Sequence, residues 1–154
     1  MLTVLDSPAR KLIILQKGSY SLAEIRDELD AFLNGHARDL DKNRIFLALE
    51  EAIVNVFEHT YANRSGELRM TLMRMNRTIR IELEDDGPAF DPTTIPLPDP
   101  EDLAESGRDG GYGLFLMRSI MQVEHRARTE GGNLLILEKV LPETASDAPG
   151  KSKD

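Results

Sequence analysis

The chain contains no cysteine, which excludes disulfide bridges and thiolate metal sites and is compatible with a reducing cytosol. Its start lacks the basic region and long apolar core of a signal peptide, and no run approaches the ~18 apolar residues that span a bilayer. We therefore expect a soluble, cytoplasmic protein that does not enter a membrane. The 154 residues suit one domain with its own hydrophobic core.

Basic residues are scarce where acidic residues gather. The net charge is −8, and residues 82–109 hold ten acids against one base, Arg108, so this segment carries −9 and the rest about +1. Binding to nucleic acid requires a continuous basic surface. We therefore expect no direct nucleic-acid partner.

The spacing of apolar residues predicts one α+β domain over residues 10–141. Short apolar or alternating runs predict strands over 11–16, 68–72, 79–83, 124–129 and 134–140. Helical spacing predicts helices over 22–34, from Asp41 to about Tyr61, and over 112–121, with Ser21 and Asp41 as the first two N-caps. This order predicts a two-layer sandwich in which helices cover one face of a mostly antiparallel sheet.

Residues 86–112 carry five of the eight prolines and show no clear periodicity. A stretch of about 27 residues without regular structure inside a compact domain is usually a functional lid or a disordered insert. We expect a lid over about 91–112, with one short helix over 99–105. Residues 1–9 are interpreted as an N-terminal extension and residues 142–154 as a flexible polar tail.

The helix expected after Asp41 has two stripes. The apolar stripe, which should face the core, consists of Ile45, Leu49, Ala52, Ile53 and Val56. Glu51, Asn55 and His59 form a second stripe at positions i, i+4 and i+8. Polar residues opposite an apolar stripe normally face water, so this pattern alone is a weak indication of a site.

Two later segments strengthen the interpretation of the polar stripe as part of a site. They are Asp85-Asp86-Gly87-Pro88-Ala89-Phe90-Asp91-Pro92 and Gly110-Gly111-Tyr112-Gly113-Leu114. A carboxylate at a strand end can accept a hydrogen bond from an exocyclic amino group. Bare backbone amides at a helix N-terminus can hold phosphates. Three such segments in this order and at these distances indicate a nucleotide site.

These three segments resemble the GHKL ATPases and, among them, the anti-sigma-factor serine kinases. The resemblance covers roughly residues 10–140, and the run from Gly113 to Met121 is especially similar to the kinase branch. It implies a Bergerat-type ATP-binding fold, ATP and Mg²⁺ as cofactors, and phosphoryl transfer to a protein serine or threonine.

The resemblance also implies a role for each matching residue. Asn55 would be the Mg²⁺ ligand, because an amide oxygen is a hard, neutral donor, and Glu51 would accept the proton of the attacking hydroxyl. Asp85 would bind the exocyclic amino group of adenine, and Gly87 would let the backbone approach the base. The other nucleotide-binding positions would be His59, Ala89, Arg108, Gly110, Gly111, Tyr112, Gly113 and Leu114.

Two positions depart from the family pattern. Ala89 stands where glycine is usual, and Asn133 follows Gly132 where a threonine is usual. Asn133 either replaces the threonine as a polar contact to the base, or that contact is absent. A histidine metal cluster is not expected, because the three histidines are far apart in sequence and lack ligand spacing.

The resemblance implies two protein partners: a STAS-domain anti-anti-sigma protein, phosphorylated on serine, and a sigma factor, which the kinase sequesters. It also implies a homodimer. One alternative is a nucleotide-gated binding module with little or no phosphoryl transfer, in which ATP orders residues 91–110 and thereby a partner surface. Another is a histidine-kinase catalytic domain, which is disfavoured because no phosphoacceptor helix accompanies it.

Overall fold

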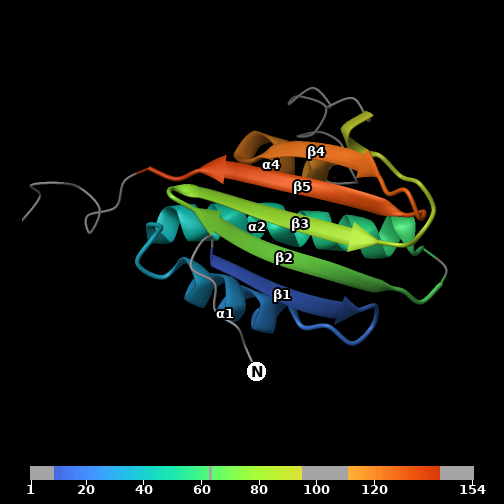
Figure 1. Cartoon of the computed structure of the whole chain (residues 1–154), viewed down its shortest axis with the longest axis horizontal. Helices are drawn as coiled ribbons and strands as arrows, with labels where there is room; N and C mark the ends of the chain where they lie inside the picture. Colours follow the sequence, from blue (N-terminus) through green and yellow to red (C-terminus); the bar gives the residue numbers. More distant parts are fainter. Residues whose placement is uncertain (1–8, 63, 95–110, 143–154) are drawn as a thin grey trace, which may run out of the picture.

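The computed structural model describes residues 9–62, 64–94 and 111–142. Residues 1–8 of the expected N-terminal extension, most of the expected lid with its short helix over 99–105, and nearly all of the expected tail lie outside these residues. Five strands form one antiparallel sheet in the order β1-β2-β3-β5-β4 (Figure 1). Their bounds are β1 Ala9–Gln16, β2 Glu67–Met75, β3 Thr78–Asp85, β4 Gln122–Ala127 and β5 Asn133–Val140.

The α-helices of the described residues cover one face of this sheet, as Figure 1 shows. They are α1 Leu22–Leu33, α2 Asp39–Asn55 and α4 Gly111–Ile120. The predicted α+β two-layer sandwich is thus confirmed, and every strand predicted in the described part of the chain is present with its ends shifted by at most a few residues. Among the described residues, no helix is long and apolar enough to cross a membrane.

The core lies between the helices and the covered face of the sheet. The apolar stripe predicted for α2 is buried along its whole length, from Ile45 to Val56. It packs in one core with alternate residues of the adjacent strands β2 and β3, which are Leu68, Met70, Leu72, Ile79, Ile81 and Leu83. Because strand side chains alternate between faces, this pattern fixes which face of β2 and β3 the helices cover.

The starts of α1 and α2 differ in how they are capped. Ser21 caps α1 as predicted, because its side chain accepts a hydrogen bond from the Glu24 amide at 3.2 Å. The predicted cap of α2 is wrong: the helix begins at Asp39, and Asp41 lies inside its first turn. Asp41 is only 2% exposed, and its carboxylate accepts a hydrogen bond from Arg38 Nε at 2.8 Å. An acid in the first turn also interacts favourably with the helix dipole.

The prediction of one regular α-helix to about Tyr61 is wrong at its C-terminal end. After Asn55 the helix continues as a π-helix, η1, over Val56–Thr60, and the Tyr61 amide donates to the Val56 carbonyl at 2.9 Å. The wider turn removes His59 from the regular spacing of Glu51 and Asn55. The Lys17 ammonium donates to the carbonyls of Tyr61, Ala62 and Arg64, which terminates the helix.

The pairing of β3 with β5 joins two distant parts of the chain. Asp85, the last residue of β3, lies opposite Asn133, the first residue of β5. Asn133 also lies opposite Ala127 at the end of β4. As a result, the segment after β3 and the β4–β5 hairpin meet at one end of the sheet.

Candidate active site

The N-terminal turn of α4 lies directly against the C-terminal half of α2. A β-carbon added to Gly113 would lie 2.0 Å from Glu51 Oε1 and 2.9 Å from the Glu51 carboxyl carbon. Only glycine therefore leaves room for the Glu51 carboxylate in this position. The structure brings together two of the predicted segments, the polar stripe and the glycine-rich segment.

Glu51 is half-buried on α2. Burial raises the pKa of its carboxyl group above the ordinary value, and the nearby charges of Glu50 and Glu58 raise that pKa further. Within the described part of the chain, no hydrogen bond or ion pair holds this carboxylate. A carboxylate with a raised pKa and no fixed partner is suited to accept a proton.

Asn55 ends α2 one turn after Glu51, so the two side chains project from the same face. It is half-buried, and no hydrogen bond among the described residues engages its side chain. The described residues also contain no group of three histidines or acids that could hold a metal by itself. The donor set therefore fits a hard cation that takes one amide oxygen from the protein and its other ligands from phosphates and water.

Asp85 is 3% exposed at the end of β3. Its Oδ1 atom accepts hydrogen bonds from the Gly87 amide and from Asn133 Nδ2, both at 2.9 Å. Burial raises the pKa of this carboxyl group, and the two hydrogen bonds oppose that rise. No donor among the described residues reaches Oδ2. Because buried acceptors are normally hydrogen-bonded, Oδ2 is suited to bind an amino group of a ligand.

Gly87 lies where the chain crosses the end of η1. An added β-carbon would lie 2.5 Å from Thr60 Cγ2 and 3.2 Å from the Tyr61 ring.

The Tyr61 hydroxyl accepts a hydrogen bond from the Asp86 amide at 3.0 Å and donates to the Asp86 carboxylate at 2.7 Å. Burial and the Asp86 contact raise the Tyr61 pKa to about 12. Tyr61, for which the sequence suggested no role, thus joins η1 to the turn after β3.

The remaining predicted site residues have different surroundings. The His59 ring stacks on Phe90, with ring centres 5.6 Å apart, so His59 lies beside the segment after β3. Ala89 is exposed in this segment. Leu114 is buried in the core, which leaves only its backbone for a ligand.

Four predicted nucleotide-binding positions are not tested by side-chain geometry. Arg108 and Gly110 lie outside the described residues. Gly111 and Tyr112 form the start of α4, and only their backbone is described.

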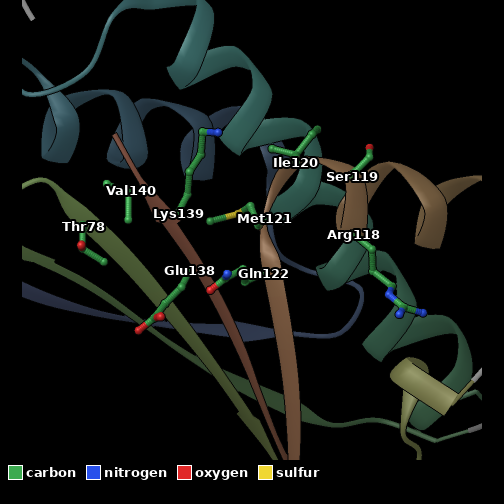
Figure 2. A pocket seen from close by; sticks show the side chains of 9 residues that line it. All are labelled: Thr78, Arg118, Ser119, Ile120, Met121, Gln122, Glu138, Lys139 and Val140. Atoms are coloured by element: carbon green, nitrogen blue, oxygen red, sulfur yellow. The ribbon is translucent and has the colours of Figure 1, made fainter. Parts of the chain in front are cut away.

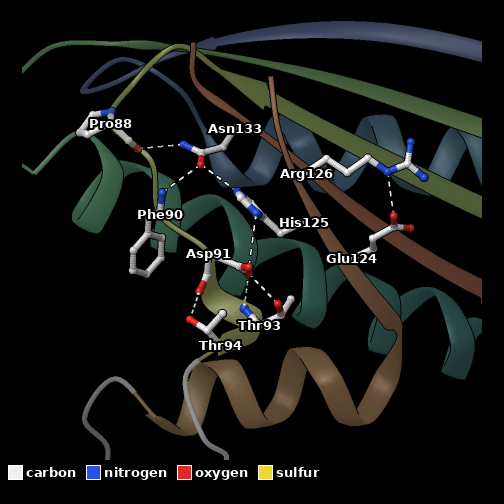
Figure 3. Close-up of polar contacts among 9 residues, drawn as sticks. All are labelled: Pro88, Phe90, Asp91, Thr93, Thr94, Glu124, His125, Arg126 and Asn133. Carbon is white, nitrogen blue, oxygen red and sulfur yellow. Dashed lines mark hydrogen bonds and ion pairs between the residues drawn. The ribbon is translucent and has the colours of Figure 1, made fainter. Parts of the chain in front are cut away.

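The role of Asn133 was left open by the sequence, and the structure gives its contacts, of which Figure 3 draws those to Pro88, Phe90 and His125. The side chain is 3% exposed and bonds to Asp85, to the Pro88 carbonyl, to the Phe90 amide and to His125. No local sequence signal reveals this role, because these partners are 8 to 48 positions away in the chain.

A cavity of about 370 Å³ lies elsewhere, between the end of α4 and the edge of the sheet (Figure 2). Its lining includes Thr78 and Val140, which pair at the end of β3 and β5 opposite to Asp85 and Asn133. Its two basic side chains, Arg118 and Lys139, extend away from each other in Figure 2. This cavity is therefore not part of the candidate active site.

Residues 18–139 match the family of the histidine kinase-like ATPase domain. Serine/threonine-protein kinase BtrW of Bordetella bronchiseptica is 30% identical over 92 residues, which are 59% of this chain and 65% of that protein. Serine-protein kinase RsbW of Oceanobacillus iheyensis is 31% identical over 106 residues, 66% of each chain. The catalytic domain of the histidine kinase ThkA has a TM-score of 0.49 and 17% identity, covering 86% of this chain and 99% of that domain.

The family match covers well over half of the chain, and this protein therefore belongs to the histidine kinase-like ATPase domain family. The GHKL resemblance inferred from the sequence is confirmed at this level. The chain aligns with about two thirds of the length of BtrW, which is named a serine/threonine-protein kinase, and of RsbW, which is named a serine-protein kinase.

Proposed function

We propose that this protein is an ATP-dependent protein-serine kinase of the anti-sigma type. The observation that carries the proposal is the position of Glu51, half-buried against Gly113 and one helical turn before Asn55. The two related kinases support the choice of serine as acceptor. The family membership supports ATP as the phosphoryl donor.

The nucleotide would bind between α2, the start of α4 and the turn after β3. Asp85 Oδ2 would accept a hydrogen bond from the exocyclic amino group of adenine, which guanine lacks at that edge. The backbone amides at the start of α4 would hold phosphates. Asn55 would hold Mg²⁺, which neutralises phosphate charge when bound.

Glu51 would act on the acceptor. Its carboxylate takes the proton of the serine hydroxyl as the hydroxyl oxygen forms its bond to the transferred phosphorus and ADP leaves with the bond electrons. The raised pKa of Glu51 favours this role, because a general base works best when its pKa lies close to the working pH.

The protein substrate would be a STAS-domain anti-anti-sigma protein, and a sigma factor would be the sequestered partner.

The proposal is tested by incubating the full chain with γ-labelled ATP, Mg²⁺ and STAS proteins encoded next to it. We expect acid-stable label on a serine of the STAS protein. Acid-labile label would indicate a histidine kinase instead. ATP-dependent binding of a STAS protein without label would favour the nucleotide-gated binding module.

A further inference from the structure

The side-chain amide of Asn133 uses all of its hydrogen-bonding capacity within the protein. Its Nδ2 atom donates to Asp85 Oδ1 and to the Pro88 carbonyl, both at 2.9 Å. Its Oδ1 atom accepts from the Phe90 amide at 2.9 Å and faces His125 Nε2 at 2.8 Å. An asparagine has two amide protons and two lone pairs, so no capacity is left for a direct contact to a base.

These contacts also fix which way the amide points. A backbone amide can only donate, and a backbone carbonyl can only accept. Phe90 N therefore requires Oδ1 on its side, and the Pro88 carbonyl requires Nδ2. Because Asn133 Oδ1 only accepts, His125 Nε2 must be the donor in their contact. The opposite ring nitrogen of His125 lies 3.5 Å from the Asp91 carboxylate.

The same bonds determine what the Asp85 carboxylate can offer. Asn133 and the Gly87 amide both occupy Oδ1, which orients the carboxylate and leaves Oδ2 without a donor among the described residues. The main chain of Asp85 is held as well, since Arg128 donates to its carbonyl at 2.9 Å. Gly132, with φ +105°, lies so close that an added β-carbon would be 2.0 Å from that carbonyl oxygen.

We propose that Asn133 is a positioning residue for base selection: it orients Asp85 for an exocyclic amino group and joins Asp85 to the segment from Pro88 to Asp91. This inference rests on the proposed function, in which Asp85 binds adenine. Asn133 acts through Asp85 and contacts no base itself. Its removal leaves the Gly87 amide as the one remaining donor to Asp85 Oδ1 among the described residues, so the carboxylate can rotate and the preference for an amino group over a carbonyl is lost.

The test compares the affinities of the full chain for ATP and ITP with Mg²⁺ present, because ITP carries a carbonyl in place of the adenine amino group. We expect Asn133→Ala to weaken ATP binding by about tenfold or more and to change ITP binding by less than about twofold. A merely structural role would weaken both nucleotides alike. Equal weakening, or an unchanged ratio of the two affinities, would overturn the proposal.

Asn133→Thr is the conservative variant. Its hydroxyl has one proton, so it can donate to Asp85 but cannot also donate to the Pro88 carbonyl. We expect it to keep more of the preference for ATP than Asn133→Ala, and it remains informative if the alanine variant does not fold. If the threonine variant folds and loses the preference completely, the Asp85 contact is not what matters, and the proposal is wrong.

Two further variants separate this inference from the proposed function. Asn43→Ala is the matched control, because Asn43 bonds Arg26 at 2.5 Å near the start of α2 and should leave the ratio unchanged. Asp85→Asn should abolish the preference. If Asp85→Asn abolishes the preference for ATP and Asn133→Ala does not, the role proposed for Asn133 is wrong and that of Asp85 stands. If the parent protein binds ATP and ITP equally, base reading by Asp85 fails and this inference fails with it.

Discussion

The two halves of the candidate active site are built in opposite ways. The base corner, made of Asp85, Gly87 and Asn133, is buried and hydrogen-bonded within the protein. The phosphate end, made of Glu51, Asn55 and Gly113, has half-buried polar side chains with no hydrogen-bond partner among the described residues.

This difference indicates that the two halves contribute to different properties of the protein. The base corner is oriented before a ligand binds, so its contribution is selectivity, and a change there should alter which base is preferred. The phosphate end has polar groups that the protein leaves unused, so a ligand and a metal must supply their partners. Changes at the phosphate end should therefore cost more activity than changes at the base corner.

Asn55→Ala should have the largest effect on nucleotide binding. It removes the only proposed protein ligand of Mg²⁺, and we expect a loss of ATP affinity beyond the 10–100-fold typical of a lost outer-shell partner. The fold should remain intact, because Asn55 is not part of the core. Calorimetric titration with and without Mg²⁺ measures this effect. ATP binding within about twofold of the parent would remove Asn55 from the metal site.

Gly113→Ala should impair catalysis at the same end without unfolding the protein. The added methyl displaces the Glu51 carboxylate, which is the far end of a flexible side chain. A misplacement of about 1 Å can cost about 100-fold in rate, whereas alanine in a helix is favoured over glycine by about 1 kcal/mol. We expect slower phosphoryl transfer with unchanged or higher thermal stability. Ser119→Ala, at an exposed position on α4, is the control.

Asp85→Asn should have a smaller and more selective effect. Asparagine can keep an acceptor for the Gly87 and Asn133 donors, but it loses the charged oxygen proposed for adenine. We expect ATP binding to weaken by about 1–3 kcal/mol, as for a broken buried hydrogen bond, while ITP binding is unchanged or stronger because the new NH2 group can donate to the ITP carbonyl. Competition titrations with both nucleotides measure the effect. Equal losses for the two would show that the base corner does not read the base.

The same variant should produce the smallest effect, a gain in stability that depends on pH. Burial raises the pKa of Asp85 above its ordinary value of 3.8. A carboxyl group with a raised folded-state pKa favours folding at low pH, and that contribution is lost as the pH rises through the raised pKa. Asp85→Asn should therefore be more stable than the parent at neutral pH, by about 0.5–2 kcal/mol. Urea unfolding should show this difference disappearing near pH 3.

The sequence was sufficient to predict the layered fold, because alternating residues in β2 and β3 and the apolar stripe of α2 are strong periodic signals. It was misleading at Asp41, because nothing local shows that its carboxylate bonds back to Arg38. The π-helix after Asn55 was also missed, since apolar and polar residues continue through it without a break in pattern.

Within the site, local motifs identified Glu51, Asn55 and Asp85 as candidates but did not reveal their surroundings. The contact of Gly113 with Glu51 depends on how α4 packs against α2. The contacts of Asn133 depend on the register of β5 against β3, which short-range spacing does not determine. Both halves of the site therefore contain contacts that only the structure reveals.

The most direct test of kinase function is the single-turnover rate of serine phosphorylation by Glu51→Gln with a STAS-domain substrate. Glutamine keeps the size of the side chain but cannot take a proton at neutral pH. We expect the rate to fall by about 100-fold or more, while the affinities for ATP and for the STAS protein change by less than about twofold. Phosphorylation at the parental rate would contradict the assignment of Glu51 as the general base.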